Sequence, residues 1–323
     1  METLKIGIVG GGGMGRVHYA NWKAIENIEI VALCDNAPNA PATAEEWGVP
    51  LYTSITEMVK NSGLNVVDIC TPTFLHHDMV MESLNLGVDT ICEKPIALNY
   101  ADAKEMLDTA EAKGCNLYIA QVLQFTREVE TLREVVQSER YGKPLDGCFE
   151  RLTAVPKWSA GGWLFDKEKS GLLPFDLHIH DLDVIVSMFG KPDDVIFTEC
   201  AGEGKAYSEQ YRFLYVYYNG LNVCAEAAWF NAAIPFTARW RVYFERGMLV
   251  CDHNGVTGYD ADGTVTKFDI TDPVQVDCGI NLGTSGWFYR ELSHLLACAK
   301  KGEASPLVPK QRVLDVIEIL EKV

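Results

Sequence analysis

Acidic and histidine side chains alternate at residues 176–183, which read DLHIHDLD. On a helix, Asp176, His180 and Asp183 share one face because they are spaced i, i+4 and i+7. A histidine with a carboxylate one turn away can act as a general base with an orienting partner. His178 lies on the opposite side of such a helix, and we expect it to be a packing or surface histidine.

Two other roles are compatible with the same residues. Asp176-x-x-x-His180 could supply two ligands of a metal, but no third ligand of suitable spacing accompanies them, so we expect no metal site. Asp176 could instead cap the N-terminus of the helix. That role would leave His180 unexplained.

A lysine stands between an acid and a proline in Glu93-Lys94-Pro95, directly after a strand-like run. Ligands of an open parallel sheet bind beyond the carboxyl ends of its strands. A lysine at such a position can donate a hydrogen bond to a substrate oxygen and stabilise a developing alkoxide. The alternative is a solvated loop lysine. Thr71 and Pro72 follow another apolar run, at residues 66–70, and should lie at the same edge.

A glycine-rich turn, Gly10-Gly11-Gly12-Gly13-Met14-Gly15, joins an apolar run at residues 4–9 to a helix-like segment. In a dinucleotide site Gly10 makes the turn, Gly12 lets backbone N–H groups approach the pyrophosphate, and Gly15 allows close helix packing. The N-terminus of the helix then faces the phosphates. A plain strand-helix connection is the alternative.

An acid follows the next apolar run at the position that a dinucleotide fingerprint requires. Asp35 lies 20 residues beyond Gly15, where a carboxylate accepts a hydrogen bond from a ribose 2′-OH. The carboxylate would repel a 2′-phosphate, and no arginine adjoins it. The sequence therefore predicts NAD in preference to NADP.

The elements that must position these residues fall into two patterns. Strand-like runs alternate with helix-like segments over the first part of the chain, which predicts a doubly wound parallel sheet, the Rossmann fold. From about residue 122 strand-like runs follow one another, joined by turn dipeptides such as Asn219-Gly220. We expect a dinucleotide-binding domain at 1–122 and, at 123–323, a mostly antiparallel open sheet covered by helices. The strand-like runs of the second part are 147–155, 195–201, 211–218, 223–230, 238–244 and 248–251.

Composition narrows the class of protein. The net charge of -17 over 323 residues disfavours nucleic acid and anionic membranes as partners. No apolar stretch approaches the roughly 20 residues that span a bilayer, and no signal-peptide pattern precedes the first strand. The ten cysteines are scattered without a C-x-x-C motif, which indicates free thiols in a reducing compartment. We expect a cytoplasmic protein.

The chain resembles the glucose-fructose oxidoreductase, inositol dehydrogenase and rhizopine-catabolism (Gfo/Idh/MocA) oxidoreductases over nearly its whole length. Glu93-Lys94-Pro95 is the most specific element of the resemblance. The other matching elements are Gly10 to Gly15 with His18, Thr71-Pro72 with His76, Cys92 to Ala97, and Ser170-Gly171 leading into Asp176-x-x-x-His180. The resemblance implies that Lys94, Asp176 and His180 are catalytic, and that the second domain binds substrate and forms a homo-oligomer, a dimer or tetramer.

The resemblance also extends the set of expected ligand contacts. For the dinucleotide the set is Gly10, Gly12, Gly13, Met14, Gly15, Asp35, Thr71, Pro72, His76, Glu93, Lys94 and Gln121. For the substrate it is Lys94, Gln124, Trp158, Trp163, Asp176 and His180. Many family members carry an arginine where this chain has Gln124, which puts an anionic substrate in doubt. Trp158 and Trp163 are suited to cover the apolar face of a sugar or cyclitol ring, or to anchor a lid by packing.

Three functions remain open at this point. The resemblance favours an NAD-dependent dehydrogenase that oxidises a secondary alcohol of a sugar or cyclitol. A glycoside-processing enzyme that uses tightly bound NAD transiently is the first alternative, and it would release no net NADH. A non-catalytic, nucleotide-responsive binding protein is the second, but it would give no reason for the combination of Lys94, Asp176 and His180.

Overall fold

The computed structural model describes residues 3–279 and 283–323. The chain divides into two compact units, which we describe separately: Met1–Phe125 with Asp272–Lys310, and Thr126–Thr271 with Gln311–Val323. These two units are defined by contacts within the structure. A domain, in contrast, is a part of the chain that can fold by itself, which contacts alone do not test. The domain extents 1–122 and 123–323 therefore stay a prediction.

The first unit contains a sheet of six parallel strands in the order β3-β2-β1-β4-β5-β6. The strands are β1 (Leu4–Val9), β2 (Ile28–Cys34), β3 (Leu51–Tyr52), β4 (Val66–Ile69), β5 (Asp89–Glu93) and β6 (Leu117–Ala120). This is the dinucleotide-binding order, in which ligands bind where the order reverses, between β1 and β4. The predicted Rossmann fold is confirmed.

Helices connect these strands, and local sequence signals define where they begin. The side chains of Ser54 and Asn99 accept hydrogen bonds from the backbone N–H groups of Glu57 and Asp102 at two helix N-termini. A later helix, α9 (Trp287–Lys301), belongs to the same unit and packs against α1 and η2. The remaining helices are α1 (Gly13–Ala24), α2 (Ala40–Trp47), α3 (Ile55–Ser62), α4 (His76–Asn85), α5 (Tyr100–Lys113), η1 (Thr73–Leu75) and η2 (Val122–Phe125).

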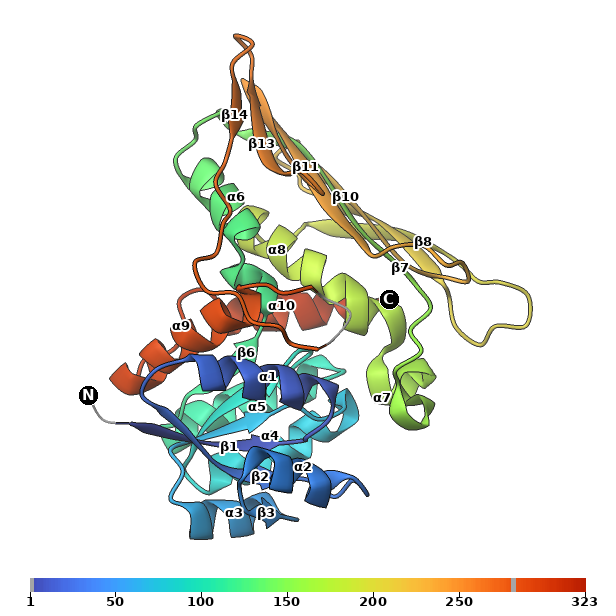
Figure 1. Cartoon of the computed structure of the whole chain (residues 1–323). Helices are drawn as coiled ribbons and strands as arrows, with labels where there is room; N and C mark the ends of the chain where they lie inside the picture. Colours follow the sequence, from blue (N-terminus) through green and yellow to red (C-terminus); the bar gives the residue numbers. More distant parts are fainter. Residues whose placement is uncertain (1–2, 280–282) are drawn as a thin grey trace. The chain divides into compact units, whose positions relative to one another are not determined.

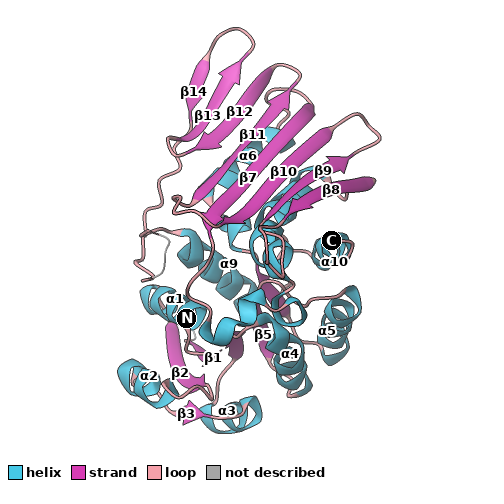
Figure 2. Cartoon of the chain, turned by 90° about the vertical axis from the view of Figure 1, so that its right-hand side faces the viewer, coloured by secondary structure: helices cyan, strands magenta, loops and turns pink. Residues whose placement is uncertain are grey.

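The second unit contains a sheet of eight strands in the order β14-β13-β12-β11-β7-β10-β9-β8, which Figure 2 shows side by side. Neighbouring strands are antiparallel except β7 and β10. The strands are β7 (Pro144–Ala154), β8 (Asp194–Cys200), β9 (Gln210–Val216), β10 (Asn222–Phe230), β11 (Thr237–Phe244), β12 (Gly247–Asp252), β13 (Gly255–Asp260) and β14 (Val265–Lys267). The predicted mostly antiparallel sheet is confirmed. Strands β13 and β14 were not predicted, because these short strands have few apolar residues.

The two faces of this sheet differ. Along β9 the side chains of Phe213 and Tyr215 are buried, whereas those of Arg212 and Leu214 are exposed. Figure 1 shows the sheet nearly edge-on, with α6 and α8 against one face and no helix of the described residues against the other. The helical segments of this unit are α6 (Arg127–Gln137), η3 (Ala160–Phe165), α7 (Lys167–Ser170), a π-helical turn (Pro174–His178), α8 (Ile179–Phe189) and α10 (Lys310–Leu320).

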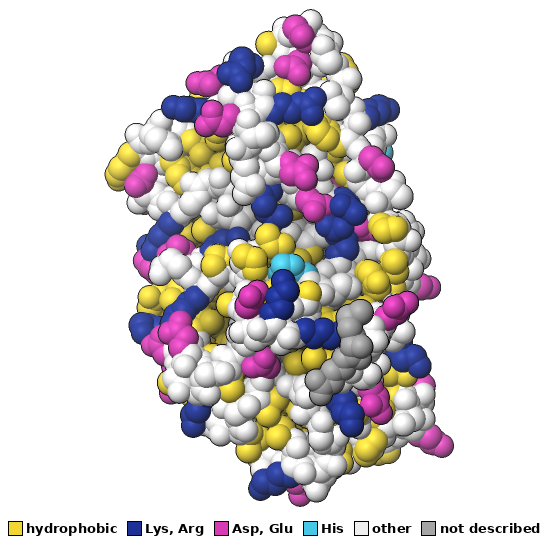
Figure 3. All heavy atoms as spheres, turned by 90° about the vertical axis from the view of Figure 1, so that its left-hand side faces the viewer, with side chains coloured by type: hydrophobic (Ala, Val, Ile, Leu, Met, Phe, Trp, Pro, Cys, Tyr) yellow, Lys and Arg dark blue, Asp and Glu magenta, His cyan; other side chains and the backbone are white. Residues whose placement is uncertain are grey.

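Three further features of the described residues are the polarity of the helices, the distribution of surface charge and the state of the cysteines. Within residues 3–279 and 283–323, every helix is too short or too polar to cross a membrane. Acidic and basic side chains are interspersed over the face drawn in Figure 3. All ten cysteines lie in the described part of the chain and are free thiols.

Candidate dinucleotide and catalytic site

The turn between β1 and α1 requires glycine at two positions. Gly10 has a φ of 92°, and a Cβ on it would lie 2.9 Å from the carbonyl oxygen of Cys70 and 3.0 Å from the side chain of Thr71. A Cβ on Gly15 would overlap the carbonyl oxygen of Gly10. Only glycine therefore lets β1, β4 and α1 approach each other this closely.

The glycines at the tip of the turn have the opposite surroundings. A Cβ on Gly12 or Gly13 would meet no atom within 4 Å. No side chain of the described residues caps α1 at Gly12, so the first backbone N–H groups of the helix remain available to a ligand. This open cradle at a helix N-terminus fits the pyrophosphate of a dinucleotide.

Asp35 follows β2 at the same edge of the sheet. Its two carboxylate oxygens accept hydrogen bonds from the backbone N–H groups of Gly11, at 2.7 Å, and Ala37, at 2.8 Å. These bonds fix the carboxylate beside the glycine turn, and each oxygen keeps a further lone pair for a hydroxyl donor. The arrangement suits a ribose hydroxyl.

His76 connects the loops that follow β4 and β5. Its Nδ1 lies 2.7 Å from the carbonyl oxygen of Pro95, and its Nε2 lies 2.9 Å from that of Thr71. Burial is the main cause that lowers the pKa of His76 below its ordinary value. The ring is therefore neutral near pH 7, and its single N–H donates to one of the two carbonyls. Its position suggests that it holds the loops that carry Thr71, Pro72 and Lys94.

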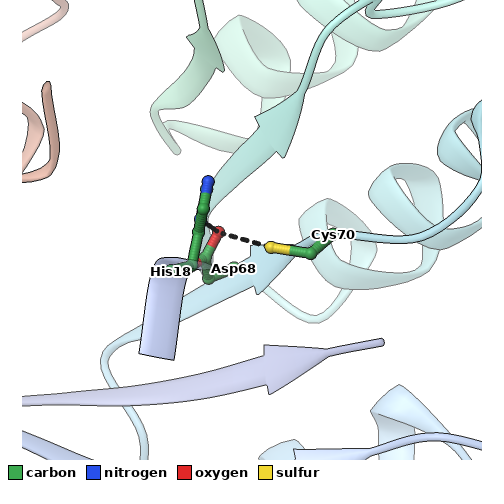
Figure 4. A group of neighbouring side chains, drawn as sticks. All are labelled: His18, Asp68 and Cys70. Atoms are coloured by element: carbon green, nitrogen blue, oxygen red, sulfur yellow. Dashed lines mark hydrogen bonds and ion pairs between the residues drawn. The ribbon is translucent and has the colours of Figure 1, made fainter. Parts of the chain in front are cut away.

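A buried chain of ionisable groups lies behind Lys94. Asp68 in β4 contacts His18 Nδ1 at 2.9 Å and accepts a hydrogen bond from Trp22 Nε1 at 2.7 Å. His18 Nε2 lies 3.0 Å from Glu93 Oε1, and the backbone N–H of Lys94 donates to Glu93 Oε2 at 3.0 Å. Figure 4 shows His18 and Cys70 directed at the Asp68 carboxylate.

The expectation that residues 66–70 form a wholly apolar run is wrong at Asp68. This side chain is fully buried in the centre of a parallel strand. A buried carboxylate needs a partner, so an aspartate inside an otherwise apolar run was the signal that could have pointed to His18.

The acidic stretch at residues 176–183 is not one regular helix. Residues Pro174–His178 form a π-helical turn, and α8 begins at Ile179. Such turns are frequent at functional sites. Asp176 lies in the π-helical turn and His180 in the first turn of α8, and both are half-buried.

The other polar residues of this stretch anchor it within the second unit. Asp181 is buried and accepts two hydrogen bonds from Arg151, at 2.8 and 2.9 Å. The carboxylate of Asp183 is paired with Arg312 at 3.1 Å, so Asp183 is a structural residue. His178 stacks on Phe213, and burial lowers its pKa to about 3. His178 was expected to be a packing or surface histidine, and its burial shows that it is a packing histidine.

The remaining predicted site residues lie in both units. Gln121 and Gln124 are buried next to or within η2 of the first unit. In the second unit Trp158 is 56% exposed, and Trp163 is half-buried within η3. Lys94 lies in the first unit at the end of β5, together with Glu93 and the dinucleotide candidates, whereas Asp176 and His180 lie in the second. Their roles toward ligands stay predictions.

Two family models match the chain. Residues 4–121 match the model described as an oxidoreductase family with an NAD-binding Rossmann fold, and residues 129–250 match the GFO/IDH/MocA C-terminal domain. The chain belongs to the GFO/IDH/MocA oxidoreductase family, as the resemblance predicted. The predicted cofactor, NAD, is that of this family, and the glycine cradle and Asp35 fit it.

The individual relatives that match the chain have low sequence identity to it. The 2,7-anhydro-N-acetylneuraminate hydratase of Mediterraneibacter gnavus is 30% identical over 67% of this chain and 58% of its own length. The D-glucoside 3-dehydrogenase of Escherichia coli is 30% identical over 59% of this chain and 55% of its own length. The matches thus span little more than half of these relatives. A levoglucosan dehydrogenase solved with NADH and levoglucosan has a TM-score of 0.85 at 18% identity, over 98% of this chain and 95% of that chain, which supports the fold.

Proposed function

We propose that this protein is an NAD-dependent dehydrogenase that oxidises a secondary alcohol of a sugar or cyclitol to a ketone. The observation that carries the proposal is the open glycine cradle with the fixed Asp35 carboxylate beside it, in a chain of an NAD-binding oxidoreductase family. Gly12 and Gly13 would receive the pyrophosphate, and Asp35 would accept from the ribose hydroxyl.

Bound NAD would supply the hydride acceptor, and the chain's own residues would handle the proton. Lys94 would donate a hydrogen bond to the reacting oxygen and stabilise its developing negative charge. His180 would accept the hydroxyl proton as general base, and Asp176 would orient it. The buried pair of Asp181 with Arg151 and the buried stack of His178 on Phe213 support this assignment, because they fix the segment that carries His180.

The relatives support the substrate class. The Escherichia coli relative is a D-glucoside 3-dehydrogenase, and a relative from Thermotoga maritima, 26% identical over 61% of this chain, is a myo-inositol 2-dehydrogenase. A panel of polyols, aldoses, glycosides and inositols, scanned for NADH absorbance, tests the proposal. Turnover of a polyol or sugar with stoichiometric NADH supports it, and failure of the whole panel with bound NAD contradicts it.

The Mediterraneibacter gnavus relative favours a second candidate. That protein is named as a hydratase, and a lyase or hydratase that uses NAD transiently would leave no NADH in solution. The two candidates are separated by mass spectrometry of the product. Product that differs from substrate by one water without net NADH identifies the second function, whereas a ketone with NADH identifies the first.

We also propose a homo-oligomer formed through the open face of the eight-stranded sheet. Ile196, Leu214 and Tyr243 are 54%, 38% and 47% exposed there, and such apolar surface favours burial between copies. Light scattering at micromolar concentration tests this, and a monomer mass contradicts it. A cytoplasmic location is proposed on the free thiols alone.

A further inference from the structure

His18 is enclosed between two carboxylates. Its Nδ1 lies 2.9 Å from Asp68 and its Nε2 lies 3.0 Å from Glu93, and both the ring and Asp68 are fully buried. A neutral imidazole has only one N–H, whereas two carboxylate partners require two donors. Geometry thus favours an imidazolium. Burial alone would lower the pKa of His18, but the charge of Asp68 and its hydrogen bond outweigh burial, so the pKa lies well above the ordinary value.

The same residues could be mistaken for a metal site. Donor atoms of His18, Asp68 and Cys70 lie within 4.8 Å of one another. However, Asp68 already accepts from the indole N–H of Trp22, and burial raises the pKa of the Cys70 thiol, so no thiolate is available. The cluster is better explained by hydrogen bonds and an ion pair than by a metal.

A further acid, Glu291 of α9, is close enough to this cluster for its charge to matter. Its side chain is fully buried, and neither carboxyl oxygen has a hydrogen-bond partner among the described residues. Burial raises the pKa of Glu291 well above its ordinary value, and the charge of Glu93 adds to the effect. An isolated buried carboxylate is unfavourable, so Glu291 holds its proton near pH 7.

We propose that Asp68, His18 and Glu93 form a buried ion chain that positions Lys94, and that Glu291 is the neutral acid beside it. The proposal rests on the role of Lys94 in the proposed function. Trp22 fixes Asp68, Asp68 fixes His18, and His18 fixes one oxygen of Glu93. The other oxygen of Glu93 holds the backbone N–H of Lys94. His18 is thus a positioning residue.

The chain also connects Lys94 to the helix whose N-terminus forms the glycine cradle. His18 lies in α1, one turn beyond Gly15, whereas Glu93 ends β5. The ion chain therefore connects α1, which carries candidate dinucleotide contacts, with β5, which ends directly before the candidate catalytic residue Lys94. Loss of the imidazolium should leave the cradle formed but release Lys94.

Other ionisable groups surround the ion chain of Asp68, His18 and Glu93, and their protonation states affect its net charge. They are Cys70 directly after β4, Cys92 from β5, His76 from α4, Cys278 from the segment before α9, and Glu291 from α9. Burial raises the pKa of each of these thiols, so they are neutral near pH 7. Ionised Glu291 would add a further negative charge beside Glu93 and Asp68.

The ionisation of His18 is measurable without turnover. In the full-length protein labelled with ¹⁵N-histidine, one of the seven rings should remain doubly protonated at pH 8, with slow solvent exchange. His77 is half-buried and also pairs with carboxylates, so His77→Gln serves as the matched control. The slow signal should persist in His77→Gln and titrate at lower pH in Asp68→Asn. A spectrum with every slowly exchanging ring neutral at pH 8 would overturn the proposal.

Kinetics test the positioning role. Asparagine at residue 18 can still contact Asp68 but is too short to bridge to Glu93. We expect His18→Asn to lower kcat by about 10²-fold, the cost of an ångström-scale misplacement, while the Kd for NAD changes by less than about threefold. Unchanged kcat in a folded His18→Asn variant would refute the positioning role and leave the proposed dehydrogenase intact. A wild type that oxidises no alcohol would refute the proposed function, and the histidine spectrum would still decide the state of His18.

Discussion

Buried charges are organised differently in the two units of this protein. In the second unit two buried carboxylates each pair with a guanidinium: Asp181 is bound by Arg151 through two hydrogen bonds, and Asp183 by Arg312. In the first unit one imidazole serves Asp68 and Glu93, and Glu291 lies buried nearby without a hydrogen-bond partner among the described residues. The buried acids named in the second unit are balanced by guanidinium groups, whereas the buried cluster of the first unit has more acid than base.

The two arrangements of buried charge have different chemical capacities. A balanced, bidentate pair has one favoured protonation state and serves to fix elements, here α8 against β7. A cluster with excess acid must keep a proton, and its charge then depends on pH. The balanced pairs of the second unit serve as a scaffold. The acid-rich cluster of the first unit lies directly behind Lys94 and can influence the chemistry proposed for it.

The largest effect should come from two groups outside both buried clusters. His180→Ala should lower kcat by roughly 10²- to 10⁴-fold, the usual worth of a general base, and Lys94→Ala should cost as much or more. Both variants should still bind NAD, because neither residue contributes to the glycine cradle. Rates are to be measured on the alcohol that the substrate panel identifies.

Matched controls for these two variants are available. His253 and Lys113 are exposed residues of the second and first units, and their replacement by alanine should leave kcat unchanged. If His180→Ala retains the wild-type kcat and pH profile, Lys94 becomes the candidate base.

The sequence predicted the helices and strands far better than it predicted which distant side chains contact each other. The strand-like runs expected at 211–218 and 223–230 correspond to β9 and β10, because alternation of apolar and polar residues is a local signal. The ion chain joins residues 50 and 75 positions apart, and nothing local marks such contacts. Glu291 likewise appears as an ordinary polar residue of an amphipathic helix. The π-helical turn before α8 was missed because its residues also suit an α-helix.

The second largest effect should be on stability. Asp181→Asn leaves the Arg151 guanidinium buried without its counter-ion, so it should lower the free energy of unfolding by about 3–5 kcal/mol. Urea unfolding measures this. Arg239→Gln is the control, because it breaks an ion pair with Glu150 in which the arginine is 57% exposed, and it should have little effect. Equal losses in both variants would show that Asp181 does not anchor α8 in the way described.

Asp35 differs from both kinds of buried acid, because its oxygens are fixed by two backbone N–H groups. We expect wild type to prefer NAD over NADP by a few kcal/mol in kcat/KM, from one charged hydrogen bond and repulsion of the 2′-phosphate. Asp35→Ser should narrow this gap. Equal kcat/KM with the two cofactors in wild type would contradict the assignment.

The smallest effect tests the excess acid itself. Burial, with the charge of Glu93, raises the pKa of Glu291 above the ordinary 4.5, so above pH 4.5 the folded state binds a proton that the unfolded chain has released. The contribution of Glu291 to the stability of wild type therefore falls as pH rises toward its folded pKa. Glu291→Gln carries no such proton and should gain on wild type by up to about 1.4 kcal/mol per pH unit. Below pH 4 both proteins are neutral at this position, so the gain should vanish.

The raised pKa of His18 acts in the same direction, since its stabilisation is complete below the ordinary 6.5 and is lost only as pH rises through the folded value. Because His18 is present in both proteins, the difference between Glu291→Gln and wild type reports Glu291 together with its electrostatic coupling to His18. Glu26 is exposed, and Glu26→Gln is the control that should follow the wild-type curve at every pH. A pH-independent difference between Glu291→Gln and wild type would mean that Glu291 carries no extra proton, and the contrast between the two units would then reduce to geometry.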